Sequence, residues 1–286
     1  MTTRASAIGG SLLLAAASAA ALGSLTVQLA FAVVAIGVIG MAHGASDLAI
    51  VERRRRPVFL ALYALVGILC LSWWIADPAV ALPAFLVASA VHFGLEDAPD
   101  GAILEKIVRG TSLVATPATF HMGALTELLS LAGTPTFVPP MVAVMAFAGG
   151  GAAAWLIAGA IQHRDGRLLT GTAALLVLPP LVGFSVGFLM LHALPQTAER
   201  SDQLGCADIA DYLRATGPIL FSAVVLIGIT GGLLLRLDPS GVRPLFAGIA
   251  ALAVPHLLVT PWFEPLERPF GAMRGRRRMM IGISNG

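Results

Sequence analysis

The chain has 286 residues, of which 57% are hydrophobic and 12% are charged, and its formal net charge is +2. Soluble domains carry about 25% charged residues, so this composition excludes an ordinary soluble protein, and the small net charge predicts no nucleic-acid partner. The two cysteines, Cys70 and Cys206, are far apart in the sequence, which excludes a disulfide framework or a CxxC metal site. With a mean hydropathy of +0.86, the chain is predicted to be an integral membrane protein.

The apolar segments are continuous, without the alternation of apolar and polar residues that strands of a membrane barrel require. Because lipid admits only helices or closed barrels, the sequence predicts an all-α, polytopic transmembrane helix bundle. A span needs about 20 residues, and on that basis we expect eight or nine spans among these segments: 7–24, 26–46, 57–76, 79–95, 107–131, 137–162, 168–192, 217–236 and 244–260.

The connections between these segments are short, and they predict one integral membrane domain over residues 1–286. Its core is expected at 26–260 and a basic C-terminal tail at 268–286. Segment 107–131 is the least regular, because Pro117 and His121 interrupt it; it is predicted to be a broken or re-entrant element, which leaves the number of spans at eight or nine. We expect a multi-pass protein of the cell (inner) membrane.

Histidines are concentrated where lipid is expected. The chain has six, and all but His163 lie within or at the ends of apolar segments. A single histidine in a membrane helix is usually a hydrogen-bonded core residue, but ionisable residues within the membrane are rare and mark functional sites. Five of them on separate segments favour a functional cluster: His43, His92, His121, His192 and His256.

Two of these histidines share a local pattern, "HGASD" at 43–47 and "HFGLED" at 92–97. A helix places residues i and i+4 on one face, so Asp47 is expected one turn from His43 and Glu96 one turn from His92. Imidazole that binds a metal usually has its other ring nitrogen held by a carboxylate or carbonyl. Asp47, Glu96 and the adjacent Asp97 are therefore predicted to support metal-binding histidines, the alternative being helix-end carboxylates that face water.

Five short motifs lie in the order found in the Brp/Blh family, which the chain resembles over roughly residues 40 to 260. They are "GMAHGASDL" (40–48), "SAVHFGLED" (89–97), "PATFHMG" (117–123), "LMLHALPQ" (189–196) and "VPHLLV" (254–259). That family comprises membrane-embedded β-carotene 15,15′-dioxygenases, which supply retinal to microbial rhodopsins.

The resemblance implies an enzyme that uses Fe2+ and O2 to cleave the central double bond of β-carotene into two molecules of all-trans-retinal. The implied partners are β-carotene, O2 and the lipid bilayer, with a functional link to a retinal-binding rhodopsin. Carried over motif by motif, the implied iron ligands are His43, His92 and His192. No catalytic residue beyond the metal centre is implied.

The fourth ligand position departs from the family pattern, because Gln196 stands where a histidine is expected. An amide oxygen is a weaker metal ligand than imidazole. His256, and after it His121, are the candidates to supply the missing imidazole.

The carotenoid has no polar handle, so its recognition must rely on shape and apolar burial in a tunnel between helices. Candidate tunnel residues are Phe93, Phe120, His121 and Phe188. Three alternatives stay open at this point. They are a catalytically impaired relative that binds carotenoid or retinal, which Gln196 favours; a metal-ion or proton transporter, which histidines and carboxylates on several helices favour; and a haem protein.

Overall fold

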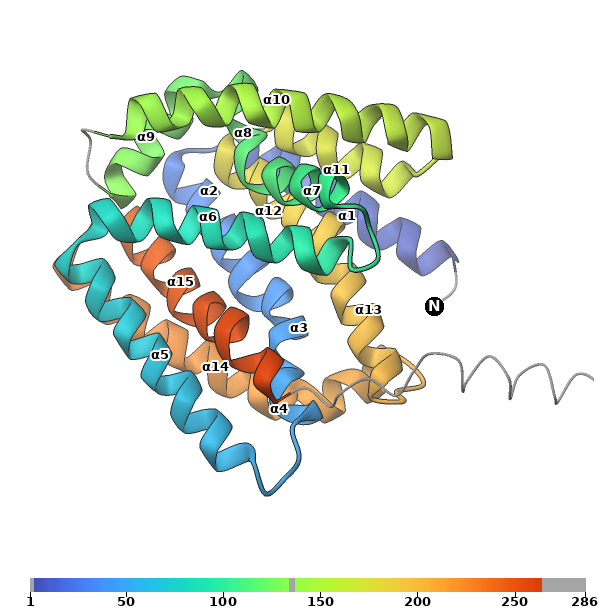
Figure 1. Cartoon of the computed structure of the whole chain (residues 1–286), viewed down its shortest axis with the longest axis vertical. Helices are drawn as coiled ribbons and strands as arrows, with labels where there is room; N and C mark the ends of the chain where they lie inside the picture. The colour runs from blue at the N-terminus through green and yellow to red at the C-terminus, as the bar shows by residue number, and fades with distance from the viewer. Residues whose placement is uncertain (1–2, 134–136, 264–286) are drawn as a thin grey trace, which may run out of the picture.

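The computed structural model describes residues 3–133 and 137–263, and every regular element within them is a helix (Figure 1). The predicted all-α fold is confirmed. The elements are α1 (Thr3–Ala21), α2 (Leu25–Val34), the π-helix η1 (Ala35–Gly40), α3 (Met41–Ala45), α4 (Asp47–Ile50), α5 (Arg56–Ala76), α6 (Pro78–Asp97), α7 (Ile103–Ala115), α8 (Pro117–Phe120), α9 (Met122–Ala132), α10 (Val138–His163), α11 (Gly166–Val177), α12 (Pro180–Phe188), the π-helix η2 (Leu189–Ala193), α13 (Leu194–Gln203), α14 (Ile209–Leu237), α15 (Val242–Val259) and the 3-10 turn η3 (Thr260–Trp262).

Seven helical segments are long and apolar enough to cross a membrane, judged by length and composition over the described residues. This number of candidates is lower than the eight or nine spans expected from the sequence. Three of the segments are composite, because α2 to α4 form one, α12 to α13 form another, and α15 with η3 forms the third. The seven are Leu25–Ile50, Arg56–Ala76, Pro78–Asp97, Val138–His163, Pro180–Gln203, Ile209–Leu237 and Val242–Trp262.

Proline accounts for two of the differences in span number. Segment 107–131 is broken, as predicted, into α7, α8 and α9, with breaks before Pro117 and at His121. Segment 168–192 is not one span, because α11 ends at Val177 and a new helix starts at Pro180. The adjacent prolines at 179 and 180 have no backbone N–H to continue the α11 ladder. Segment 7–24 corresponds to α1, whose apolar part Gly9–Ala21 is among the shorter helices.

Polar residues that follow α12 continue its helix. The helix runs on through η2 and α13 as far as Gln203, and α14 begins at Ile209 with Asp208 accepting a hydrogen bond from the backbone N–H of Asp211. The basic tail predicted at 268–286 lies outside the described residues.

Glycines allow the helices around the centre of the molecule to pack closely. A Cβ atom at Gly94 of α6 would meet the backbone carbonyl of Lys106 in α7, and one at Gly110 of α7 would meet the carbonyl of Ala90 in α6. Such small-residue contacts are the usual way in which membrane helices approach each other. They fix α6, which carries four of the candidate site residues, firmly against α7.

This packing predicts opposite effects for two Gly→Ala substitutions. Gly110→Ala is expected to lower the free energy of unfolding by about 1–3 kcal/mol, because the new methyl overpacks the α6–α7 contact. Gly151→Ala in α10 has no atom within 4 Å of its added Cβ, so it should leave stability unchanged or raise it by up to about 1 kcal/mol through helix propensity. Thermal unfolding in detergent, followed by circular dichroism, measures both. Equal stability of the two variants would contradict the proposed close contact.

Candidate metal centre

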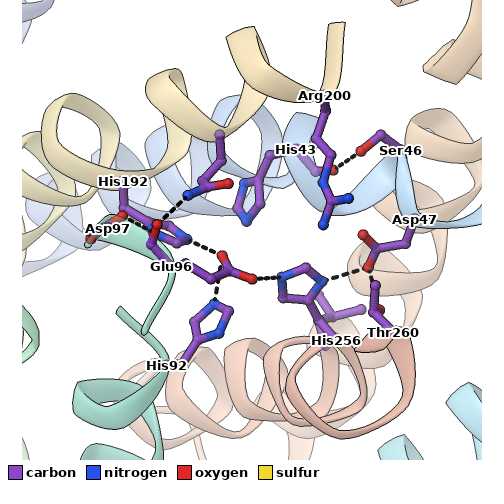
Figure 2. Close-up of polar contacts among 12 residues, drawn as sticks. His43, Ser46, Asp47, His92, Glu96, Asp97, His192, Arg200, His256 and Thr260 are labelled. Carbon is purple, nitrogen blue, oxygen red and sulfur yellow. Dashed lines mark hydrogen bonds and ion pairs between the residues drawn. The ribbon is translucent and has the colours of Figure 1, made fainter. Parts of the chain in front are cut away.

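Four histidines from different parts of the chain meet inside the helix bundle (Figure 2). His43 comes from α3, His92 from α6, His192 from η2 and His256 from α15. Their ring centroids form a closed circuit, with separations of 5.1 Å from His43 to His192, 5.3 Å from His192 to His92, 5.2 Å from His92 to His256 and 5.5 Å from His256 to His43. His192 is fully buried, and His43 and His256 are 9% and 7% exposed. The histidines predicted from separate segments thus converge.

The outward-facing nitrogens of three rings have hydrogen-bond partners. His192 Nδ1 donates to Asp97 Oδ1 at 2.9 Å, His256 Nδ1 donates to Asp47 Oδ2 at 2.5 Å, and His43 Nδ1 lies against the backbone carbonyl of Gly40. A ring that donates through Nδ1 carries its free lone pair on Nε2. Within the described chain, the buried Nε2 atoms of His192 and His256 have no hydrogen-bond partner. In the neutral rings these Nε2 atoms carry a lone pair, and each lies 3.8 Å from an oxygen of the Glu96 carboxylate.

The carboxylates do not pair with histidines in the way that the sequence suggested. Asp47 was expected to support His43, one turn away, but it bonds His256 of a distant helix, while His43 uses a backbone carbonyl of its own helix. Asp97 supports His192 rather than a histidine of its own helix. The pairings join helices, because a buried carboxylate bonds the nearest donor whichever element provides it.

Glu96 lies inside the circuit of histidines rather than behind it. Its Oε2 is 3.4 Å from His92 Nε2 and 3.8 Å from His192 Nε2, and its Oε1 is 3.8 Å from His256 Nε2 (Figure 2). Ligand atoms of His92, Glu96 and His256 all fall within 4.8 Å of one another. Glu96 was predicted to support a ligand from outside; its carboxylate instead faces the same point as the imidazoles.

Gln196 takes a different direction. Its side-chain nitrogen donates to the backbone carbonyl of Glu96 at 3.2 Å, so its amide serves to tie α13 to the end of α6. The fourth imidazole in the circuit belongs to His256, the first of the two candidates for that place.

Two of the four histidines lie in or just after a π-helical segment. η1 ends at Gly40, just before His43, and η2 contains His192. A π-helical turn inserts a residue into the helix, rotates the side chains that follow and leaves carbonyls without their usual partners. Gly40 also lets the Phe188 ring approach its backbone, since a Cβ there would collide with that ring.

Phe93 and Phe188 form an apolar wall beside the imidazoles. The Phe93 ring is 4.7 Å from His192, and the Phe188 ring is 5.5 Å from His192 and 6.1 Å from His43. The other two predicted tunnel residues are placed elsewhere. Phe120 is 69% exposed at the end of α8, and the ring of His121 bonds the backbone carbonyl of Val177.

With this geometry described, comparison with protein families identifies the chain. The model of the beta-carotene 15,15′-dioxygenase family matches residues 34–264. The chain belongs to this family. Comparison with curated proteins and with solved structures gives no match. The matched range includes every residue of the histidine circuit, and the protein is accordingly of the β-carotene dioxygenase type.

Several residues of this dioxygenase-type site were not predicted from the sequence. Thr260 donates to Asp47 Oδ2 at 2.8 Å, and the hydroxyl of Tyr212 donates to the carbonyl of Ala42, next to His43, at 2.6 Å. Arg200, 9% exposed, reaches toward His43 and Asp47 from α13 (Figure 2). Arg200 and Tyr212 lie in a polar stretch, where neither residue type is unusual, so no sequence signal distinguished them.

The side chains at this site suit a divalent metal that prefers nitrogen and oxygen ligands. Imidazole suits iron, zinc and copper, and carboxylate oxygen completes such sets. The free, buried Nε2 atoms of His192 and His256 are the observation that supports this fit, since buried polar atoms normally have partners. Both cysteines are free and neither is part of the histidine circuit, so thiolate does not belong to this ligand set.

Thr260 tests the energetic importance of the Asp47 carboxylate. Thr260→Val keeps the side-chain shape and removes the hydroxyl that donates to this buried group, and we expect a loss of about 1–3 kcal/mol in the free energy of unfolding. Thr126→Val is the matched control, because Thr126 donates only to the Met122 carbonyl of its own helix. Thermal unfolding in detergent compares them. Equal melting temperatures would mean that Asp47 gains nothing from Thr260.

Proposed function

We propose that this chain cleaves β-carotene at its central double bond, using Fe2+ and O2, to give two molecules of all-trans-retinal. The observation that carries the proposal is the convergence of four imidazoles and the Glu96 carboxylate in a buried apolar bundle, in a chain that belongs to the β-carotene 15,15′-dioxygenase family.

The reaction balances without another reductant. The C15=C15′ double bond breaks, and each of its carbons receives one oxygen atom of O2, so that two aldehydes form. Neither an acid nor a base is required, because no proton is gained or lost. Bound Fe2+ would supply the activation of dioxygen, which does not react with a closed-shell alkene unaided.

The proposed ligands are His43, His92, His192 and His256 through Nε2, with Glu96 as the carboxylate. The negative charge of Glu96 would offset the charge of the metal in a medium of low dielectric constant. Asp97 and Asp47 hold the rings of His192 and His256 by their outer nitrogens, which keeps both Nε2 lone pairs directed inward.

Phe93 and Phe188 are proposed to position the polyene. Their rings lie against His192, so a flat conjugated chain held against them would lie next to the ligand circuit. An apolar wall also excludes water from the oxidation. A bundle within the bilayer suits this substrate, because β-carotene dissolves in lipid and reaches the site without crossing water.

The position of His256 bears on the alternative of an impaired, binding-only relative. That alternative arose because Gln196 stands where the family pattern expects a histidine. A fourth imidazole is present in the circuit without Gln196, so the replacement gives no reason to expect lost activity. We propose that the cleavage activity is retained.

The cleavage activity is tested in cells that accumulate β-carotene. Expression of the chain should bleach the cells and yield retinal, measured by chromatography, whereas His43→Ala and His92→Ala should each reduce retinal to background and remove iron from the purified protein. His163→Ala, an exposed histidine whose ring bonds the Gly159 carbonyl, should retain both. Retinal at the wild-type level from His43→Ala and His92→Ala would refute the ligand assignment; transport of metal ions in liposomes without any retinal would favour the transporter.

The fourth ligand is tested by comparing His256→Ala with Gln196→Ala. We expect His256→Ala to lower the affinity for Fe2+ and for Co2+ by at least roughly tenfold, since a directly bound nitrogen is lost and support residues alone contribute 10–100-fold. Gln196→Ala should bind metal as the wild type does, because its amide is engaged with the backbone of Glu96. Metal content and the visible absorption of bound Co2+ are the readouts. The reverse ranking would restore Gln196 as a ligand.

A further inference from the structure

An apolar cavity lies far from the histidines, toward the other end of α6. It has a volume of about 350 Å³, within the range of pockets that hold small organic ligands. Every side chain that lines it among the described residues is apolar. Three come from the first turns of α6 and three from the start of α10 and the residue before it: Ala79, Leu82, Pro83, Phe137, Val138 and Met141.

The spacing along α6 relates this cavity to the candidate metal centre. Leu82 precedes His92 by ten residues in one helix, and a helix rises about 1.5 Å per residue, which gives about 15 Å. An extended trans chain advances about 1.2 Å per bond, as the polypeptide backbone does over three bonds per residue. Nine bonds separate C15 of β-carotene from its end ring, so the ring lies about 11–14 Å from the central double bond. The two lengths are similar, the spacing along the helix being longer by about 1–4 Å.

One face of α6 connects the two places. Leu82, Leu86, Ser89 and Phe93 follow one another at spacings of four, three and four residues, which places them in a row along the helix. The row starts in the cavity and ends at the Phe93 ring, 4.7 Å from the ring of His192. Leu82, Ser89 and Phe93 are buried, so a chain that follows this row from the cavity to the imidazoles has to displace side chains packed against it.

Side chains beside this row are able to move. Met141 lines the cavity, and Met145 lies one turn further along α10; both are only partly buried where they pack on the core, as is Leu86. Methionine has an unbranched, flexible side chain that adapts to irregular apolar ligands. The route along α6 is therefore bordered by groups that can make room for a polyene.

We propose that this cavity binds one end ring of the carotenoid, so that the spacing along α6 sets the distance from that ring to the bond that is cleaved. The inference rests on the proposed function, since it takes a two-ringed carotenoid as the substrate. The end ring of β-carotene is a hydrocarbon that offers no hydrogen bond, and the apolar side chains that the structure describes around the cavity leave no partner unsatisfied when the ring enters.

Filling the cavity tests this assignment. Leu82→Trp fills it from α6 and Met141→Trp fills it from α10, so the two variants act from independent walls. The matched controls are Val87→Trp and Val144→Trp on the same helices, because Val87 and Val144 are 65% and 70% exposed on the outer surface. All four proteins are purified in detergent, loaded with Fe2+ and checked for iron content and for thermal unfolding.

Two substrates are compared. β-Carotene has a ring at each end, whereas a β-apocarotenal has one ring and a shortened arm that ends in an aldehyde. The apocarotenal can place its ring at the opposite end and needs little room in the filled cavity. We expect both filling variants to lose more than roughly tenfold in kcat/KM for β-carotene and much less for the apocarotenal, while both controls keep the wild-type values for the two substrates.

The results separate this inference from the proposed function. The inference is overturned if the ratio of kcat/KM for the two substrates is unchanged in Leu82→Trp and Met141→Trp. An equal loss for both substrates is one such result, and displacement of a lipid chain or damage to the fold would cause it. If the wild type cleaves neither substrate, the proposed function fails. In that case, binding of β-carotene without O2 tests the role of the cavity separately. A shift in β-carotene absorption with the wild type and both controls, but not with the filling variants, supports a ring site. Equal binding by all the proteins overturns it.

Discussion

The pairing of buried carboxylates with buried imidazoles is the interaction on which the rest of this structure depends. An unpaired carboxylate or imidazolium in an apolar interior costs several kcal/mol, and hydrocarbon provides no water to repay it. Asp47 therefore bonds His256 and Thr260, and Asp97 bonds His192. Each of these contacts joins elements far apart in sequence, so the chain avoids the cost only in a fold that brings α4 to η3 and α15, and α6 to η2.

That requirement imposes two kinds of backbone adjustment. Close helix packing is needed to bring the rings within about 5 Å of each other, and glycine provides it where Gly94 faces Lys106 and Gly40 faces Phe188. The π-helical segments η1 and η2 turn the following residues out of the regular register. A regular α-helix would direct one or more of these histidines toward lipid, where its nitrogens would have no partner.

The types of residue at the site were easier to predict from the sequence than the directions in which their side chains point. His43, His92 and His192 were identified because an ionisable residue in an apolar segment must face protein, and such residues from several segments have one common interior to share. The sequence pattern also placed Glu96 on the same helix face as His92, but it could not give the rotamer that turns the carboxylate inward. The partner of Asp47 was missed because periodicity relates residues within one helix, and His256 lies more than two hundred positions away. The break at Pro179 and Pro180 was readable, and it was overlooked because the surrounding residues are strongly apolar.

The helix α6 has a part in this molecule that neither its length nor its hydropathy reveals. It carries His92, Glu96 and Asp97 at one end and half of the apolar cavity at the other, and the rise per residue of the helix sets the spacing between them. A helix has a fixed rise per residue, so that one added turn moves a side chain by about 5.4 Å along the axis. Along a polyene that distance equals between four and five bonds at about 1.2 Å per bond. In the proposed mode of binding, an α6 with one more or one fewer turn would therefore present a different double bond to the proposed metal ligands. With the end ring bound as proposed, the number of residues between these two features of α6 would determine which double bond is cleaved, without any change in the ligands.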